Sequence, residues 1–175
     1  MLDVWRHRVI LLMLAGSVGL SACAAEIDPA EALTRGVREQ QAGNLDAARE
    51  AYLQVLEVQP RNEYALYDLG TIEQAQGRTE LAEGYYREAL DVDPRMEGAL
   101  FNLAIIRAKV GATQEAIDLY RRTIAVAPDN ARAHYNLGLL LQEAGQKDEA
   151  VKEIEQAIAL DPSLLSSGTS PTPSS

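Results

Sequence analysis

Few side chains in this sequence of 175 residues could carry out chemistry, and they do not form a catalytic arrangement. The chain has two histidines, His7 and His134, and one cysteine, Cys23. A nucleophile activated by a histidine base would have to use His134, because His7 lies in an N-terminal segment that we expect to be removed. That count also excludes zinc sites built from cysteines and histidines. We predict no enzyme activity, no metal site and no cofactor.

Carboxylate pairs do occur, such as Asp91 with Asp93 and Glu153 with Glu155. We expect them on helix exteriors and ends, where acidic side chains usually serve as solvated charges. No glycine-rich phosphate loop follows a strand, since the chain has no convincing strand. The formal net charge is −10, and no basic stripe interrupts it. Such a chain repels a phosphate backbone, so we do not expect a nucleic acid as partner. Because no catalytic arrangement is found, we expect no small-molecule substrate either.

The first 22 residues have the features of an export signal that is cleaved off. A basic stretch, Arg6-His7-Arg8, precedes an apolar run of 12 residues, Val9 to Leu20. A membrane-spanning helix needs about 20 apolar residues, so this run fits the core of a signal peptide better than a permanent anchor.

The thiol of Cys23 has the sequence context that lipid attachment needs. Leu20-Ser21-Ala22-Cys23 resembles the lipobox of bacterial lipoproteins. That resemblance implies that the thiol, a good nucleophile at mild pH, receives a diacylglycerol and that cleavage occurs just before it. Cleavage after Ala24 by an ordinary signal peptidase, or an incidental thiol, are the alternatives. Lipidation is favoured because Cys23 has no second cysteine with which to form a disulfide.

The residue after Cys23 bears on the membrane to which the chain is sorted. In Gram-negative lipoproteins an Asp at that position favours the inner membrane, whereas this sequence has Ala24. The resemblance therefore implies the periplasmic face of the outer membrane. Another cell-envelope membrane, a Gram-positive cell surface or the soluble periplasm are the alternatives.

Four columns of residues recur every 34 positions, which is the strongest signal in the sequence. They are Gly43, Gly77, Gly111 and Gly145; Ala48, Ala82, Ala116 and Ala150; Pro60, Pro94, Pro128 and Pro162; and the bulky Tyr52, Tyr86, Tyr120 and Ile154. The pattern resembles the tetratricopeptide repeat. That resemblance implies an all-α, right-handed superhelical solenoid of four helix-turn-helix repeats over residues 29–162. The repeats are residues 29–62, 63–96, 97–130 and 131–164.

Each column has a structural role. We expect the glycines to end the first helix of each repeat in the left-handed conformation and the prolines to end the second. The alanines should face a small residue of the first helix, at Gly36, Gly70, Ala104 or Gly138, so that the two axes approach closely. The bulky residue four positions later should pack toward the neighbouring repeat. Asp28, Asn62 and Asn130 are expected helix N-caps.

The outermost repeats depart from the family pattern, as expected where one face meets solvent. His134 stands at a bulky packing position, so we expect it to be structural. No capping helix is expected after the fourth repeat, whose last helix has enough charged residues to cap itself. Residues 23–28 form a tether of about 20 Å at most, and residues 163–175 should be disordered.

The resemblance implies a concave groove lined by the first helix of each repeat. The candidate groove residues are Tyr64, Tyr67, Thr71, Phe101, Asn102, Ile105, Arg132, Tyr135, Asn136 and Leu139. Aromatic rings can bury the apolar side chains of a peptide while asparagines bind its backbone. The alternative is that the rings pack on one another and the asparagines are solvated. A clamp for a C-terminal carboxylate, found in some relatives, would match only Asn102 and Arg132 and is not expected.

We therefore expect a lipid-anchored protein–protein interaction scaffold of the cell envelope that binds peptide segments of envelope proteins. Among lipidated tetratricopeptide proteins it is similar to the pilotins of pilus or secretion-system secretins and to adaptors for cell-wall hydrolases. A secretin, a pilus component or a cell-wall enzyme are the partners that these resemblances imply.

Overall fold

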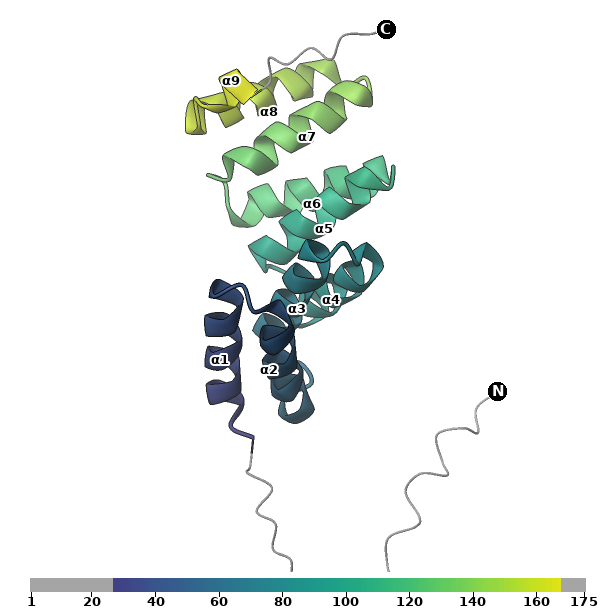
Figure 1. Cartoon of the computed structure of the whole chain (residues 1–175). Coiled ribbons are helices and arrows are strands. Elements are labelled where there is room, and N and C mark those ends of the chain that lie inside the picture. Colours follow the sequence, from purple (N-terminus) through teal and green to yellow (C-terminus); the bar gives the residue numbers. More distant parts are fainter. Residues whose placement is uncertain (1–26, 168–175) are drawn as a thin grey trace, which may run out of the picture.

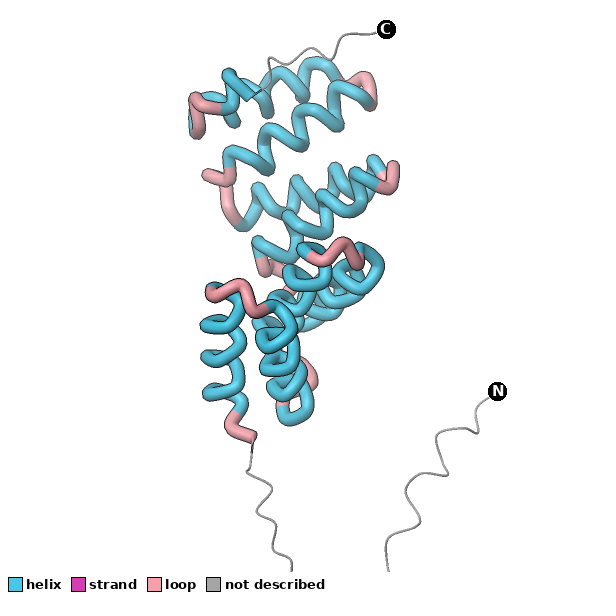
Figure 2. The backbone as a smooth tube through the Cα atoms, viewed as in Figure 1, coloured by secondary structure: helices cyan, strands magenta, loops and turns pink. Residues whose placement is uncertain are grey.

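A computed structural model describes residues 27–167, and in that range it contains helices and turns but no strands (Figures 1 and 2). The helices are α1 (Pro29–Gln41), α2 (Leu45–Val58), α3 (Glu63–Ala75), α4 (Thr79–Val92), α5 (Glu97–Lys109), α6 (Thr113–Val126), α7 (Ala131–Glu143), α8 (Lys147–Leu160) and α9 (Leu164–Ser167). None of these helices is both long and apolar enough to cross a membrane.

The first eight helices form four hairpins, α1–α2, α3–α4, α5–α6 and α7–α8, and each hairpin stacks on the next. The second helix of one hairpin packs against the first helix of the following one, which gives the elongated stack in Figure 1. The core consists of two clusters of buried, mainly alanine, leucine, isoleucine and tyrosine side chains, one over α1–α3 and one over α3–α8, and the partly buried Leu56 and Tyr85 pack against both. This is the all-α solenoid of helix pairs that the sequence predicts.

The turn inside each hairpin depends on glycine, as predicted. Gly43, Gly77, Gly111 and Gly145 have φ of 81°, 75°, 76° and 79°, values that a side chain with a Cβ rarely adopts. At Gly77 the backbone N–H groups of Gly77 and Arg78 return to the carbonyls of Gln74 and Glu73. These bonds satisfy carbonyl groups that the end of α3 would otherwise leave free.

Three of the four first helices have the predicted N-caps. The side chains of Asp28, Asn62 and Asn130 accept backbone N–H groups of α1, α3 and α7, each at 2.9 Å. The exception is α5, where Met96 stands at the capping position and makes no side-chain hydrogen bond.

The two helices of a hairpin approach closely at the small residue of the first helix, as predicted, but the nearest neighbour of that residue was not predicted. A Cβ built on Gly70 would lie 2.6 Å from Cε1 of Tyr86, and one on Gly36 would lie 2.5 Å from Cε1 of Tyr52. The nearest side chain to the glycine is therefore the tyrosine ring of its own hairpin, while the alanine four residues before that ring is buried on the same second helix. The ring was expected to pack toward the neighbouring repeat; Tyr52 lies in one core cluster with Ala65 and Leu69 of the next repeat, and the Tyr86 hydroxyl group accepts a hydrogen bond from Asn102 of the next. In the last hairpin Ile154 takes the place of the ring against Gly138.

Successive hairpins contact each other at equivalent pairs of positions, but the side chains at these positions differ from one junction to the next. Between the first two hairpins Arg49 Nε lies 2.8 Å from Glu73 Oε1, and Arg78 binds the other oxygen of the same carboxylate. The next junction reverses the charges, with Arg107 Nη1 3.2 Å from Glu83 Oε1. The last junction has Ile117 and Leu141 at these positions, both buried.

The C-terminal end of the stack is less polar than expected. Val151 of α8 is 54% exposed, and Leu165 of the short helix α9 is 58% exposed. The segment 163–175, expected to be disordered, thus begins with one helical turn that lies against α8. The rest of that segment, the signal sequence, Cys23 and most of the tether lie outside the residues that the structure describes.

Candidate functional site

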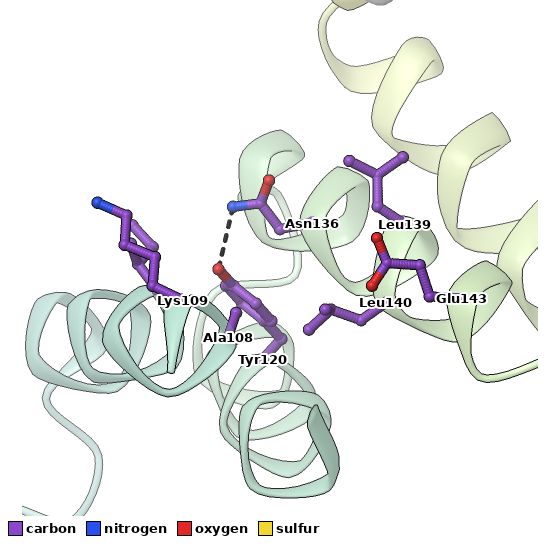
Figure 3. Close-up of a pocket in the computed structure, with 8 residues that line it drawn as sticks. Ala108, Lys109, Tyr120, Asn136, Leu139, Leu140 and Glu143 are labelled. Carbon is purple, nitrogen blue, oxygen red and sulfur yellow. Dashed lines mark hydrogen bonds between the residues drawn. The ribbon is translucent and has the colours of Figure 1, made fainter. Parts of the chain in front are cut away.

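The first helices α5 and α7, with α6 between them, form a pocket that we call the α5–α7 pocket (Figure 3). Its volume is about 420 Å³, within the usual range for ligand sites. It is lined by Ile105, Ala108 and Lys109 of α5, Tyr120 of α6, and Asn136, Leu139, Leu140 and Glu143 of α7.

The walls of the α5–α7 pocket combine apolar surface with a few polar groups. Lys109 comes from the α5 side and Glu143 from the α7 side, so charges of both signs stand at its edges (Figure 3). Inside, the Asn136 side chain donates from Nδ2 to the Tyr120 hydroxyl at 3.1 Å, which leaves its carbonyl oxygen as an acceptor. An apolar side chain of a peptide could pack against these walls while its flanking backbone groups hydrogen-bond the polar side chains.

Only part of the predicted groove lines this pocket. Ile105, Asn136 and Leu139 do, whereas the other candidate residues lie elsewhere on α3, α5 and α7. Sequence reasoning missed Tyr120 and Leu140 as lining residues. Tyr120 belongs to the bulky column of the second helices, so its recurrence was visible, but its position beneath two neighbouring first helices was not.

The aromatic column of the first helices is packed rather than freely exposed. The Tyr67 ring lies 5.9 Å from that of Tyr86, and Phe101 meets Tyr120 edge-on at 5.8 Å between centroids. Arg132 covers the Phe101 ring at 5.3 Å, a distance suited to a cation–π contact. The rings therefore pack on the buried tyrosines of their own hairpins, which the sequence did not indicate.

Tyr64 is 58% exposed, Leu139 is 39% exposed and Arg132 is also exposed, while Tyr135 is half-buried. These side chains keep surface that a partner could cover. Thr71 is committed to the fold, since its hydroxyl donates to the Asp68 carbonyl at 2.8 Å and accepts from Gln40 at 3.0 Å.

Buried tyrosine hydroxyls connect the first helices of successive hairpins, and we call each connection a hydroxyl bridge. Tyr86 donates to Gln74 Oε1 of its own hairpin at 2.8 Å and accepts from Asn102 Nδ2 of the next at 3.3 Å. Tyr120 and Asn136 repeat the second contact. The asparagine amides that we expected to bind a peptide thus each already donate one of their two N–H groups to these hydroxyls.

The first hydroxyl bridge differs because its last member is a carboxylate. Tyr52 donates to Gln40 Oε1 at 2.8 Å, and its hydroxyl also hydrogen-bonds the side chain of Asp68. Burial raises the pKa of Asp68 to about 6, while the hydrogen bond with Tyr52 acts in the opposite direction.

His134 has the structural role that was expected. It is 7% exposed, with Nδ1 2.6 Å from Glu153 Oε2 and Nε2 3.0 Å from the Pro128 carbonyl. Both ring nitrogens are therefore occupied by groups of the fold. Within residues 27–167, no cluster of three or more histidine, cysteine, aspartate or glutamate side chains is arranged to hold a metal ion.

Comparison with known proteins agrees with this architecture. The family model described as tetratricopeptide repeat matches residues 33–97, 67–127 and 101–164, and these matches begin 34 residues apart. The chain belongs to the tetratricopeptide-repeat family. The fold is thus that of a protein–protein interaction scaffold, and this family consists typically of non-enzymatic interaction modules.

Solved structures of MamA have the same fold. One crystal structure of MamA has a TM-score of 0.70 at 22% identity and covers 79% of this chain and 81% of that one. MamA from residue 41 onward of Desulfovibrio magneticus RS-1 has a TM-score of 0.66 at 17% identity and covers 82% of this chain and 78% of that one. No curated protein matches the sequence. At these identities the likeness concerns the fold alone.

Proposed function

We propose that this tetratricopeptide-repeat chain is a lipid-anchored scaffold of the bacterial cell envelope, which binds an extended peptide segment of a partner protein along α3, α5 and α7. The α5–α7 pocket is the observation that carries the proposal. It offers apolar walls for one side chain and an amide carbonyl for the peptide backbone. Concave faces of helical solenoids are their usual binding surfaces.

Several features of the pocket favour a peptide over a small polar ligand. Ile105, Leu139 and Leu140 supply aliphatic surface, and Lys109 and Glu143 lie at the edges, where a peptide's own charges could pair with them. Outside the pocket, the first helices also carry the exposed side chains of Tyr64 and Arg132, which offer further surface to a partner. A partner can thus make a chain of contacts rather than fill one cavity.

The lipid anchor is the second part of the proposal, and it rests on the Leu20-Ser21-Ala22-Cys23 motif. Cleavage before Cys23 would leave only a few residues between the lipid and Pro29, where α1 begins. The solenoid would then lie close to the membrane surface, which suits a factor that recruits envelope proteins. We propose the periplasmic face of the outer membrane because Ala24 follows Cys23.

Site-specific photo-crosslinking tests the groove. A photoreactive amino acid replaces Leu139 in the full chain, and the crosslinked peptide is identified by mass spectrometry. Leu81 is the matched control, because it is an exposed leucine of α4 outside the pocket, 55% exposed. We expect one defined segment of a partner to crosslink at position 139 and not at position 81.

Binding of that segment as a synthetic peptide should then weaken about five- to tenfold in Leu139→Ala, because a groove contact is lost, and remain unchanged in Leu81→Ala. Acidic residues of the second helices are unsuitable controls. Glu83, for example, binds Arg87 and Arg107 and so joins two hairpins. Equal crosslinking at both positions, or equal loss of affinity in both variants, would contradict a binding site on this face.

A further inference from the structure

In the hydrogen-bond order that the structure shows, the first hydroxyl bridge leaves no donor for an ionised Asp68. Thr71 Oγ1 donates to the Asp68 backbone carbonyl and therefore accepts from Gln40 Nε2. Gln40 Oε1 then faces Tyr52 and accepts the only proton of its hydroxyl. With that proton committed, the Tyr52 oxygen can only accept a hydrogen bond from Asp68.

An ionised carboxylate cannot donate, so this arrangement requires a proton on Asp68. The protonated side chain then does what Asn102 does for Tyr86 and what Asn136 does for Tyr120. Ionisation demands the reverse order, in which Thr71 donates to Gln40, Gln40 to Tyr52, and Tyr52 to the carboxylate. Asp68 therefore has two complete hydrogen-bonded states that differ by one proton.

The ionised state lacks a counter-ion within the protein. In the part of the chain that the structure describes, no lysine or arginine side chain forms an ion pair with Asp68. The titratable groups that interact with it are the phenols of Tyr52 on α2, Tyr67 on α3 and Tyr86 on α4, all of them uncharged near neutral pH. α1 contributes the Gln40 amide, and α5 contributes the Asn102 amide, which binds Tyr86.

Asp68 nevertheless remains partly exposed on the face of α3. A partly buried carboxylate without a cation is a site that a positively charged ligand group can complete, because the ligand removes the cost of the uncompensated charge. Positions equivalent to Asp68 in the next two hairpins are Asn102 and Asn136, which carry no charge. Such a ligand group would therefore be directed to one end of the groove.

We propose that Asp68 is the cation anchor of the groove: it binds a lysine or arginine side chain of the partner peptide, and under mildly acidic conditions it holds a proton when that side chain is absent. This proposal rests on the proposed function, since it assumes a peptide in the groove. It adds the peptide's chemistry, with a basic residue at α3 and an apolar residue in the α5–α7 pocket. Because these two contacts are at different ends of the groove, they also fix the direction in which the peptide lies.

The affinity for a basic peptide should fall as the pH is lowered. A bound cation favours the ionised state, so binding must expel the proton wherever the free chain holds it. Burial raises the pKa of Asp68 to about 6 in the free chain. Affinity for the basic peptide should therefore fall about tenfold between about pH 7.5 and about pH 5.

Selection from a phage-displayed library of short random peptides tests the proposal, with the parent chain, Asp68→Asn and Asp91→Asn as targets. Asp68→Asn should fold normally, because asparagine occupies the equivalent place in two other hairpins. Asp91→Asn removes the same charge at an exposed site of α4. We expect the parent and Asp91→Asn to select a basic residue at a fixed spacing from an aliphatic one, and Asp68→Asn to select the aliphatic residue alone.

The outcomes separate the two proposals. Peptides that lose affinity in Leu139→Ala but carry no basic residue, or that bind Asp68→Asn as tightly as the parent, would overturn the cation anchor and leave the groove in place. Peptides that bind Leu139→Ala as tightly as the parent, or no enrichment at all, would overturn the groove and the anchor together.

Titration of the Asp68 carboxyl carbon by NMR provides an independent measurement on the free chain. We expect a midpoint near the value given above that moves to lower pH when a selected basic peptide binds. A titration midpoint at about 3.9, the ordinary pKa of aspartate, would show that the proton-holding state does not exist.

Discussion

Replacing Gly70 by leucine should destabilise the solenoid, because this glycine makes room for the Tyr86 ring. A Cβ at Gly70 would lie 2.6 Å from Cε1 and 2.7 Å from Cδ1 of that ring, about 1 Å inside normal carbon contact. Ala104 stands opposite Tyr120 in the third hairpin, so the fold can absorb one methyl group. The branched leucine side chain adds three more carbons at a buried point.

The expected change in the free energy of unfolding is the balance of two opposing effects. Leucine gains up to about 1 kcal/mol in helix propensity over glycine, whereas overpacking of a core typically costs about 1–3 kcal/mol and occasionally more. We expect a net loss of about 1–2 kcal/mol, which lowers Tm by several degrees in a domain of this size.

Gly84 provides the matched control, because a Cβ there would meet no atom within 4 Å. Gly84→Leu, in the exposed middle of α4, should raise Tm slightly through helix propensity alone. Thermal unfolding followed by circular dichroism compares the two variants with the parent. If Gly70→Leu melts as high as the parent or as Gly84→Leu, the packing of Tyr86 on Gly70 is not what sets the spacing of α3 and α4.

Three further changes test other parts of the structure. Glu73→Gln should lower the free energy of unfolding by about 1–3 kcal/mol, because it removes the shared carboxylate partner of Arg78 and Arg49. These arginines hold the pKa of Glu73 below its ordinary value, so the stabilisation is present above about pH 4.5 and is lost as the pH falls through the lowered pKa. Denaturant unfolding should therefore show a steeper loss of stability in acid for the parent than for the variant. Tyr86→Phe should cost about 1 kcal/mol by removing a hydroxyl bridge, and no change in its urea midpoint would mean that the bridge contributes nothing. Cys23→Ser should abolish incorporation of radiolabelled palmitate, and label that persists in the variant, or never enters the parent, would exclude lipidation at Cys23.

The columns of small and turn-forming residues allowed most of the fold to be predicted, because each column answers a local requirement. A glycine with positive φ at Gly77 and an N-cap at Asn62 depend on residues only a few positions away. The Tyr86 ring was not predicted as the nearest neighbour of Gly70, since Ala82 and Tyr86 both lie on the side of α4 that faces α3 and both are buried. Which of the two meets the glycine depends on the crossing of the helices, which the repeat period does not specify.

The polar part of the groove could not be predicted in the same way, because its hydrogen bonds connect residues from three or four helices. Asn102 and Asn136 were correctly placed on the first helices, but one N–H of each is already committed to Tyr86 or Tyr120. Those bonds pair the buried tyrosine hydroxyls, which would otherwise be costly to desolvate.

At Asp68 the same structural position has a carboxylate, and no cation of the described chain compensates its charge. An asparagine there would have satisfied Tyr52 without a proton, as it does for the two later tyrosines. The substitution therefore adds nothing that the hydroxyl bridge needs, and it places on the groove a charge that is costly until a partner neutralises it. The fold does not need this charge, and for that reason we assign Asp68 to binding rather than to folding.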